Sequence, residues 1–144
     1  MSSASARQSK SKNEREYLTH ASLVSMYNSI ISLQYQDYRV VSTTLHLIIE
    51  ICLKKLGLYY GLNVSRTSHS VNGLMAELVP KDTVVASIFR ELGRTGELSE
   101  LQGFPYNELR FYEDADIPQI SLSTMAKVAY TLLARLEYIE GKMR

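Results

Sequence analysis

The sequence predicts a single all-α domain, an up-and-down bundle of four to five helices, on three observations. The chain has 144 residues, 45% of them apolar and 22% charged, which suits one domain with a substantial core. It contains only seven glycines and three prolines, few enough to leave room for long helices. Apolar residues recur at the spacing of amphipathic helices, and no stretch alternates well enough to indicate a strand. Helices joined mostly by short connections give an up-and-down bundle.

Residues 1–14 are a Ser-rich basic tail with Arg7, Lys10 and Lys12 and no large apolar residue after Met1. Such a segment cannot offset its ordering entropy by burial, so we expect it to be disordered and the bundle to occupy residues 15–144. A basic tail can contact phosphate, but most such tails only add solubility.

The first two helices are expected at residues 15–33 and 37–60. The first carries apolar residues at helical spacing, among them Tyr17, Val24, Tyr27 and Ile31. Residues 45–58 of the second are apolar on nearly all sides, which predicts burial by several neighbours. Gly61 is a suitable C-terminal stop. Because this helix has more apolar face than a small bundle covers, we expect a homodimer whose seam involves the first or second helix.

Residues that commonly begin or end helices predict three further helices. Ser68 is a natural N-cap for a short third helix that ends before Pro80. A fourth helix starts near Asp82 and stops at Gly93, and a last one runs from Ser121 or Ser123 to about residue 142. Residues 94–120 should be mostly loop, with a turn of helix around 98–101. Loops of that length are often functional.

Composition excludes several classes of protein. The net charge of +1 gives a weak overall field, which does not by itself favour nucleic acid. The single cysteine, Cys52, rules out an internal disulfide and fits a reducing compartment. No apolar run approaches the length of a membrane span and no signal core precedes the domain, so we expect a cytoplasmic protein. Without a P-loop, dinucleotide fingerprint, zinc spacing or nucleophile elbow, no cofactor or metal is expected.

Three histidines are the first candidates for chemistry. His46 sits inside the most apolar helix, where a core or interface histidine is more common than a ligand. His20 follows Arg15 at the spacing R-x4-H. His69 lies at the predicted start of the third helix beside Arg66, where free N–H groups and the guanidinium could bind a phosphate. In the alternative, Ser68 caps that helix and His69 packs against a neighbour.

The loop before the last helix combines an arginine, two aromatics and several acids. Neighbouring carboxylates can hold a hard cation or act as acid and base, but in a polar loop they usually mark a solvated turn. Arg110 with Phe111 and Tyr112 could stack on a nucleotide and pair with its phosphate. The alternative is that Arg110 anchors the loop to the bundle.

Three segments together resemble the HEPN superfamily of small helical domains. Residues 38–57 are similar to its central helix, with Glu50 and Lys54 one turn apart, and Ser68-His69-Ser70-Val71 is similar to its third-helix start. The segment 110–114, ahead of a long last helix, resembles its arginine–aromatic–acid loop. The resemblance implies a helical bundle associated with minimal nucleotidyltransferases and with defence or toxin–antitoxin systems. Nucleotide-binding residues would then be Arg66, His69, Arg110 and Tyr112.

The nuclease members of that family carry R-x(4–6)-H late in the domain. Here the positions after Arg110 hold Ala115, Asp116 and Ile117, and no histidine follows His69. The sequence therefore predicts a non-catalytic binding module, a dimeric companion of a nucleotidyltransferase or a nucleotide-binding domain.

Two alternatives remain. One is a metal-independent ribonuclease that uses Arg15 with His20, or Arg110 with His69 brought together across a dimer. The other is a plain interaction protein whose bundle only presents surface.

Overall fold

The computed structural model describes residues 18–64 and 71–143, and in them the chain forms seven helices and no strand. The expected all-α class is confirmed for these residues, whereas the helices outnumber the four to five expected. The expected disorder of residues 1–14 concerns a segment outside the described residues. In chain order the helices are α2 (His20–Ile31), α3 (Tyr38–Tyr59), α4 (Val71–Leu78), α5 (Thr83–Thr95), α6 (Leu98–Gln102), α7 (Tyr106–Phe111) and α8 (Leu122–Met143).

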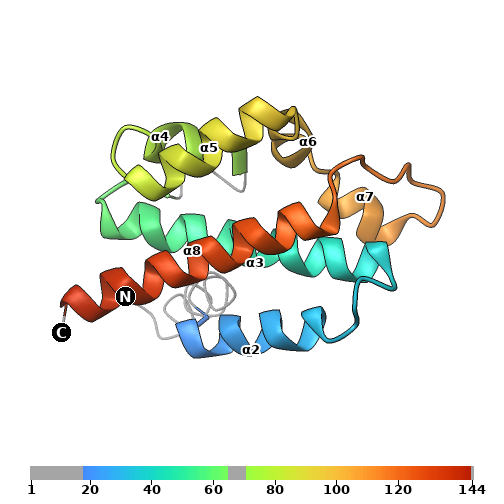
Figure 1. The fold of residues 1–144 in the computed structure, drawn as a ribbon, viewed down its shortest axis with the longest axis horizontal. Helices are drawn as coiled ribbons and strands as arrows, with labels where there is room; N and C mark the ends of the chain where they lie inside the picture. The colour runs from blue at the N-terminus through green and yellow to red at the C-terminus, as the bar shows by residue number, and fades with distance from the viewer. Residues whose placement is uncertain (1–17, 65–70, 144) are drawn as a thin grey trace, which may run out of the picture.

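The two long helices, α3 and α8, lie side by side through the middle of the molecule (Figure 1). On one side of this pair lies α2, which contacts both of them. On the other side lie α4, α5 and α6, and α7 packs on α3 at one end. The chain is therefore layered, with α2 and the α4–α6 group on opposite sides of a central pair.

The central position of α3 accounts for its composition. Side chains around its circumference are buried, including Leu45, Ile48, Ile49, Cys52 and Leu56. Four helices of the same chain, α2, α4, α7 and α8, cover them. Burial within one copy therefore explains most of the apolar surface of this helix, and the homodimer expected from it stays a prediction.

The side chains of two aspartates and one serine cap the starts of α3, α5 and α8, close to where the sequence predicted these helices to begin. The carboxylate of Asp37 accepts from the N–H of Val40 at 3.3 Å and begins α3. Asp82 caps α5, and the hydroxyl of Ser121 accepts from the N–H of Thr124 at 3.1 Å to begin α8. Capping chemistry thus sets where each of these helices begins.

Two helix boundaries differ from the sequence prediction. The fourth predicted helix continues past Gly93 and ends at Thr95, because Gly96 supplies the left-handed C-cap at φ 84°. The first predicted helix is shorter than 15–33 within the described residues. It begins at His20, after Thr19 accepts from the N–H of Ser22 at 3.1 Å, and ends at Ile31. Gly61, at φ 75°, follows α3 as expected.

Residues 94–120 contain the expected turn of helix, which is α6 at Leu98–Gln102, and one helix that was not expected, α7 at Tyr106–Phe111, so the segment holds more helix than predicted. Each short helix sends one fully buried leucine into the core, Leu101 from α6 and Leu109 from α7. Phe104, 8% exposed, is buried between them. Burial therefore stabilises two helices that are too short to show a repeating pattern in the sequence.

Within residues 18–64 and 71–143, none of the helices combines the length and apolar character that a membrane span requires.

Candidate functional site

The strongest candidate is an arginine–aromatic surface on α7, here called the α7 surface and made of Tyr106, Arg110, Phe111 and Tyr112. The Arg110 guanidinium lies 5.2 Å from the ring centroid of Phe111 and 5.9 Å from that of Tyr106, and it donates to the Tyr106 hydroxyl at 3.2 Å. Phe111 and Tyr112 are 65% and 61% exposed. Two large aromatic side chains therefore face solvent beside a cation.

This surface is held in place by Arg39, in the first turn of α3. Its guanidinium donates to the backbone carbonyls of Leu109 at 3.0 Å and Tyr112 at 2.6 Å. It also donates to the carbonyls of Glu113 and of Ala115. The alternative role foreseen for Arg110, anchoring the loop to the bundle, belongs to Arg39. Arg110 instead bonds within its own helix.

The far end of the same loop is also fixed from α3. The hydroxyl of Tyr38 donates to the carbonyl of Ile120 at 2.8 Å, and Ile120 is buried just before α8 begins. Adjacent residues of α3, Tyr38 and Arg39, therefore hold both ends of the segment 112–120. The exposed aromatics sit on a positioned segment.

The charge around the α7 surface is negative. Between residues 105 and 117 the chain carries four carboxylates and one guanidinium, that of Arg110, and the Arg39 guanidinium bound to this segment brings the cations to two. The carboxylates, Glu108, Glu113, Asp114 and Asp116, are all exposed. They favour a cationic partner and repel phosphate.

A buried histidine supports the surface from beneath. His46 of α3, 8% exposed, stacks on Phe104 at 4.7 Å and on Tyr106 at 5.5 Å between ring centroids. Burial lowers the pKa of His46 to about 4, so its ring is neutral at pH 7. His46 is the core histidine that the sequence favoured, and its stacking joins α3 to the base of α7.

The other predicted site residues are dispersed or lie outside the described part. Arg15, Arg66 and His69 fall outside it. The Nε2 of His20 lies 2.9 Å from the carbonyl oxygen of Leu133 in α8. Since a carbonyl can only accept, Nε2 carries the proton there. Helices α2 and α7 do not touch, so the structure does not bring His20 to Arg110.

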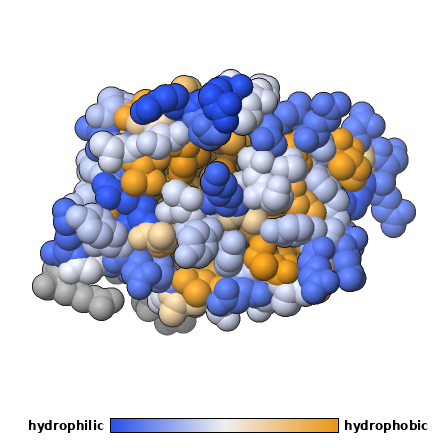
Figure 2. Space-filling view, in the orientation of Figure 1, coloured by the Kyte–Doolittle hydropathy of each residue, from blue (hydrophilic) through white to orange (hydrophobic). Residues whose placement is uncertain are grey.

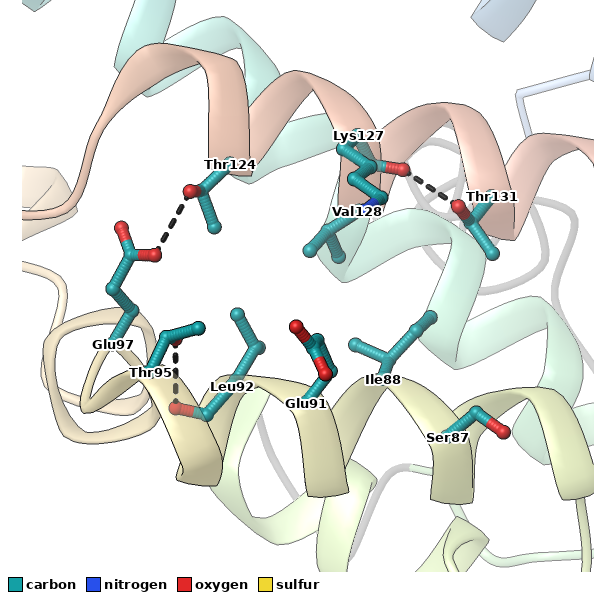
Figure 3. Close-up of a pocket in the computed structure, with 10 residues that line it drawn as sticks. All are labelled: Ser87, Ile88, Glu91, Leu92, Thr95, Glu97, Thr124, Lys127, Val128 and Thr131. Atoms are coloured by element: carbon teal, nitrogen blue, oxygen red, sulfur yellow. Dashed lines mark hydrogen bonds between the residues drawn. The ribbon is translucent and has the colours of Figure 1, made fainter.

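A pocket of about 360 Å³ opens between α5 and α8 (Figure 3). Ile88, Leu92 and Val128 supply its apolar surface, and apolar side chains reach the surface along this seam (Figure 2). Three of its hydroxyl groups are already hydrogen bonded, Thr124 to Glu97 at 2.9 Å and Thr95 and Thr131 to backbone carbonyls of their own helices. The pocket therefore offers mainly apolar contact, with Glu91 and Lys127 as further charged groups on its lining.

A buried carboxylate joins three helices at the other end of α5. Asp82, 1% exposed, accepts from the N–H groups of Val84 and Val85, from the Tyr60 hydroxyl at 2.6 Å and from Arg135 Nε at 3.0 Å. Burial alone would raise the pKa of Asp82, but these hydrogen bonds and the Arg135 charge outweigh it and lower the pKa. All of its bonds are internal, so we assign it a structural role.

The remaining reactive groups do not form a catalytic arrangement in the described residues. Burial raises the pKa of the Cys52 thiol to about 12, which keeps it protonated and unreactive. In residues 18–64 and 71–143, no three His, Cys, Asp or Glu side chains gather to hold a metal ion.

Sequence reasoning missed two of the residues that organise these sites. Arg39 acts on backbone carbonyls 70 or more positions away, for which no sequence motif exists. Asp82 was recognised as a helix start, but its contact with Arg135, 53 positions on, was not.

Fold and surface together define an all-α domain built around a buried central helix, with a positioned arginine–aromatic surface at one end. Comparisons with protein-family models, with curated proteins and with solved structures found no match to this chain.

Proposed function

We propose that this chain is a non-catalytic, HEPN-like binding module that acts as a homodimer and engages a partner protein through the α7 surface. The observation that carries the proposal is the exposure of Phe111 and Tyr112 on a segment that Arg39 holds by its backbone. Exposed aromatics cost solubility and are enriched in binding hot spots. Holding them in place before binding lowers the entropy lost on association.

A protein partner suits this surface better than a nucleotide does. The four carboxylates around Arg110 would face a phosphate with the same sign of charge. A partner that presents apolar pockets within a basic rim would complement both the aromatics and the acids. The resemblance to the HEPN superfamily implies a minimal nucleotidyltransferase as that partner.

The test is binding of the purified chain to a minimal nucleotidyltransferase from the same genome, measured by biolayer interferometry. Phe111→Ala and Tyr112→Ala should each weaken binding about tenfold or more, as expected of hot spots. Tyr130→Ala is the matched control, because Tyr130 is 63% exposed but lies on α8. Equal loss in all three variants would argue against the α7 surface, and no binding by the unmodified chain would reject this partner.

Arg39→Met tests whether positioning matters. It removes the hydrogen bonds to the loop and leaves Phe111 and Tyr112 unchanged. We expect faster amide exchange across residues 109–117 together with weaker binding. Weaker binding with unchanged exchange would contradict a positioning role for Arg39.

The nucleotide and ribonuclease alternatives have tests of their own. ATP titrated into the chain should give no heat of binding, and binding that Arg110→Met abolishes would replace the protein partner with a nucleotide. RNA incubated with the chain in EDTA should stay intact. Cleavage that His20→Ala or His69→Ala abolishes would make the chain a metal-independent ribonuclease.

A further inference from the structure

The helix α2 and the turn after it carry no charge. From Leu18 to Gln36 the sequence has no Lys, Arg, Asp or Glu, although 22% of the chain is charged and about four such residues would be expected in a surface segment of this length. The segment is not buried. Leu23 and Ile30 enter the core, and much of the rest of α2 is exposed.

The exposed side of α2 is made of small side chains. Ser22, Ser25 and Ser29 lie three and four positions apart, which places them along one side of the helix. They line a shallow groove of about 540 Å³, which is completed by Leu33 in the turn after α2 and by Thr44 of α3. Small side chains at this spacing let a second helix approach closely.

Exposed apolar side chains continue past the end of α2, two of them within the charge-free run and one beyond it. Leu33 and Tyr35 are each 41% exposed, and Val40 at the start of α3 is 46% exposed. Gln34 and Tyr35 adopt left-handed backbone conformations, at φ 52° and 63°, in the turn from α2 to α3. We call the exposed side of α2, together with Leu33, Tyr35 and Val40, the α2 face.

We propose that the α2 face is the seam of a two-fold homodimer in which α2 packs antiparallel against α2 of a second copy. This inference rests on the homodimer of the proposed function and names its interface. The α7 surface has no part in it.

Charge is the reason for choosing a second copy as the occupant. A two-fold axis places residues near the centre of a seam beside their own counterparts, so any charge there would meet its like. The middle of α2, around Ser25, carries no charge and so avoids that repulsion at the centre of the seam. A partner of different sequence could place opposite charges against charged residues of this chain, as proposed for the acidic rim of the α7 surface, so a seam with such a partner has no need to lack charge. Depletion of charge is also the compositional mark of an interface core.

The area that the α2 face can bury determines how strongly the two copies are expected to associate. With 12 residues, α2 is only about 18 Å long. A standard interface buries about 800 Å² on each partner, more than one short helix supplies, so Leu33, Tyr35 and Val40 must take part. We therefore expect a dimer with a dissociation constant of order micromolar.

The experiment combines molar mass with a symmetric cross-link. Ser25 lies near the middle of α2 and is exposed, so Ser25→Cys places two thiols close to the proposed axis. Its background is clean because the native Cys52 is fully buried. Ser87→Cys, on the exposed side of α5, is the matched control. Under mild oxidation, Ser25→Cys should give a covalent dimer and Ser87→Cys should stay a monomer.

Ser25→Glu tests the same seam by repulsion. Light scattering across a concentration series should show a dimer for the unmodified chain and at least tenfold weaker association for Ser25→Glu, with Ser87→Glu unchanged. Circular dichroism confirms that the variants fold.

Two other outcomes separate the proposals. A monomeric unmodified chain up to millimolar concentration overturns both the homodimer and its seam. A dimer that neither Ser25 variant affects keeps the homodimer but overturns the α2 face as its interface.

Discussion

Replacing Asp82 should destabilise the protein far more than replacing a second aspartate that also caps a helix. In Asp82→Ala, α5 loses its N-cap, which costs about 1 kcal/mol. The charged hydrogen bond from Arg135 is worth about 1 to 2 kcal/mol and the hydroxyl of Tyr60, left without its acceptor, costs about 1 kcal/mol more. The sum is about 3 to 4 kcal/mol, a large fraction of the stability of an ordinary domain.

The assay is urea unfolding followed by circular dichroism, with Asp37→Ala as the control. Asp37 is exposed and its bond at the start of α3 is a single cap at 3.3 Å, so its removal should cost about 1 kcal/mol at most. Tyr60→Phe removes one partner of Asp82 and should lie between the two. Equal losses from Asp82→Ala and Asp37→Ala would refute the reasoning, because they would show that the contacts with Tyr60 and Arg135 add nothing.

The carboxylate of Asp82 also makes the unfolding free energy of the protein depend on pH. The pKa of Asp82 is lower in the folded chain than in the unfolded chain, so its stabilising contribution is present above pH of about 4 and is lost as the pH falls through the folded pKa. Below that range Asp82→Ala and the unmodified chain should differ less in their free energy of unfolding.

Three further predictions concern single residues. Because the pKa of His46 falls from 6.5 to about 4 on folding, the unfolded state binds more protons between these values, and acidification from pH 6.5 to 4 should cost roughly 3 kcal/mol of unfolding free energy. His46→Phe should remove most of that slope, and an unchanged slope would place the titration elsewhere. Gly96→Ala should lower the unfolding free energy by about 1 kcal/mol, because Gly96 has φ 84°. Gly93→Ala, within the α5 helix, should instead raise the unfolding free energy by up to about 1 kcal/mol. Thermal unfolding that shifts in the same direction for both variants would contradict this. The Cys52 thiol, with its pKa raised to about 12, should react with a disulfide reagent only after unfolding in guanidinium, and rapid native labelling would show that the core opens.

Much of the fold follows from local sequence features. The apolar run of 45–58 predicts a central buried helix, and Asp37, Asp82 and Ser121 mark the starts of α3, α5 and α8 because capping is a local interaction. Of the two short helices, α6 lies where a turn of helix was expected near residues 98–101, whereas α7 could not be predicted in this way. Their stability depends on Leu101 and Leu109 reaching a core built by distant residues.

In the candidate site, too, some residues could be predicted from the sequence and others could not. The exposed residues Arg110 and Tyr112 stand next to a long helix in a recognisable cluster, so the sequence points to them. Their support could not be predicted, because Arg39 recognises carbonyl groups that every residue possesses. The apolar character of α3 is explained by burial within its own chain and so gives no reason for a dimer, while the dimer itself, with a seam expected at the first or second helix, stays a prediction.

The backbone contacts of Arg39 separate the path of the loop from its side chains. Each carbonyl that Arg39 binds would remain if residues 110–116 were exchanged for others. Selection, or a designer, could therefore vary the side chains of this segment while one arginine preserves its course, much as antibody frameworks carry loops of changing sequence. The domain would then serve as a scaffold whose recognition can be rewritten without rebuilding its core.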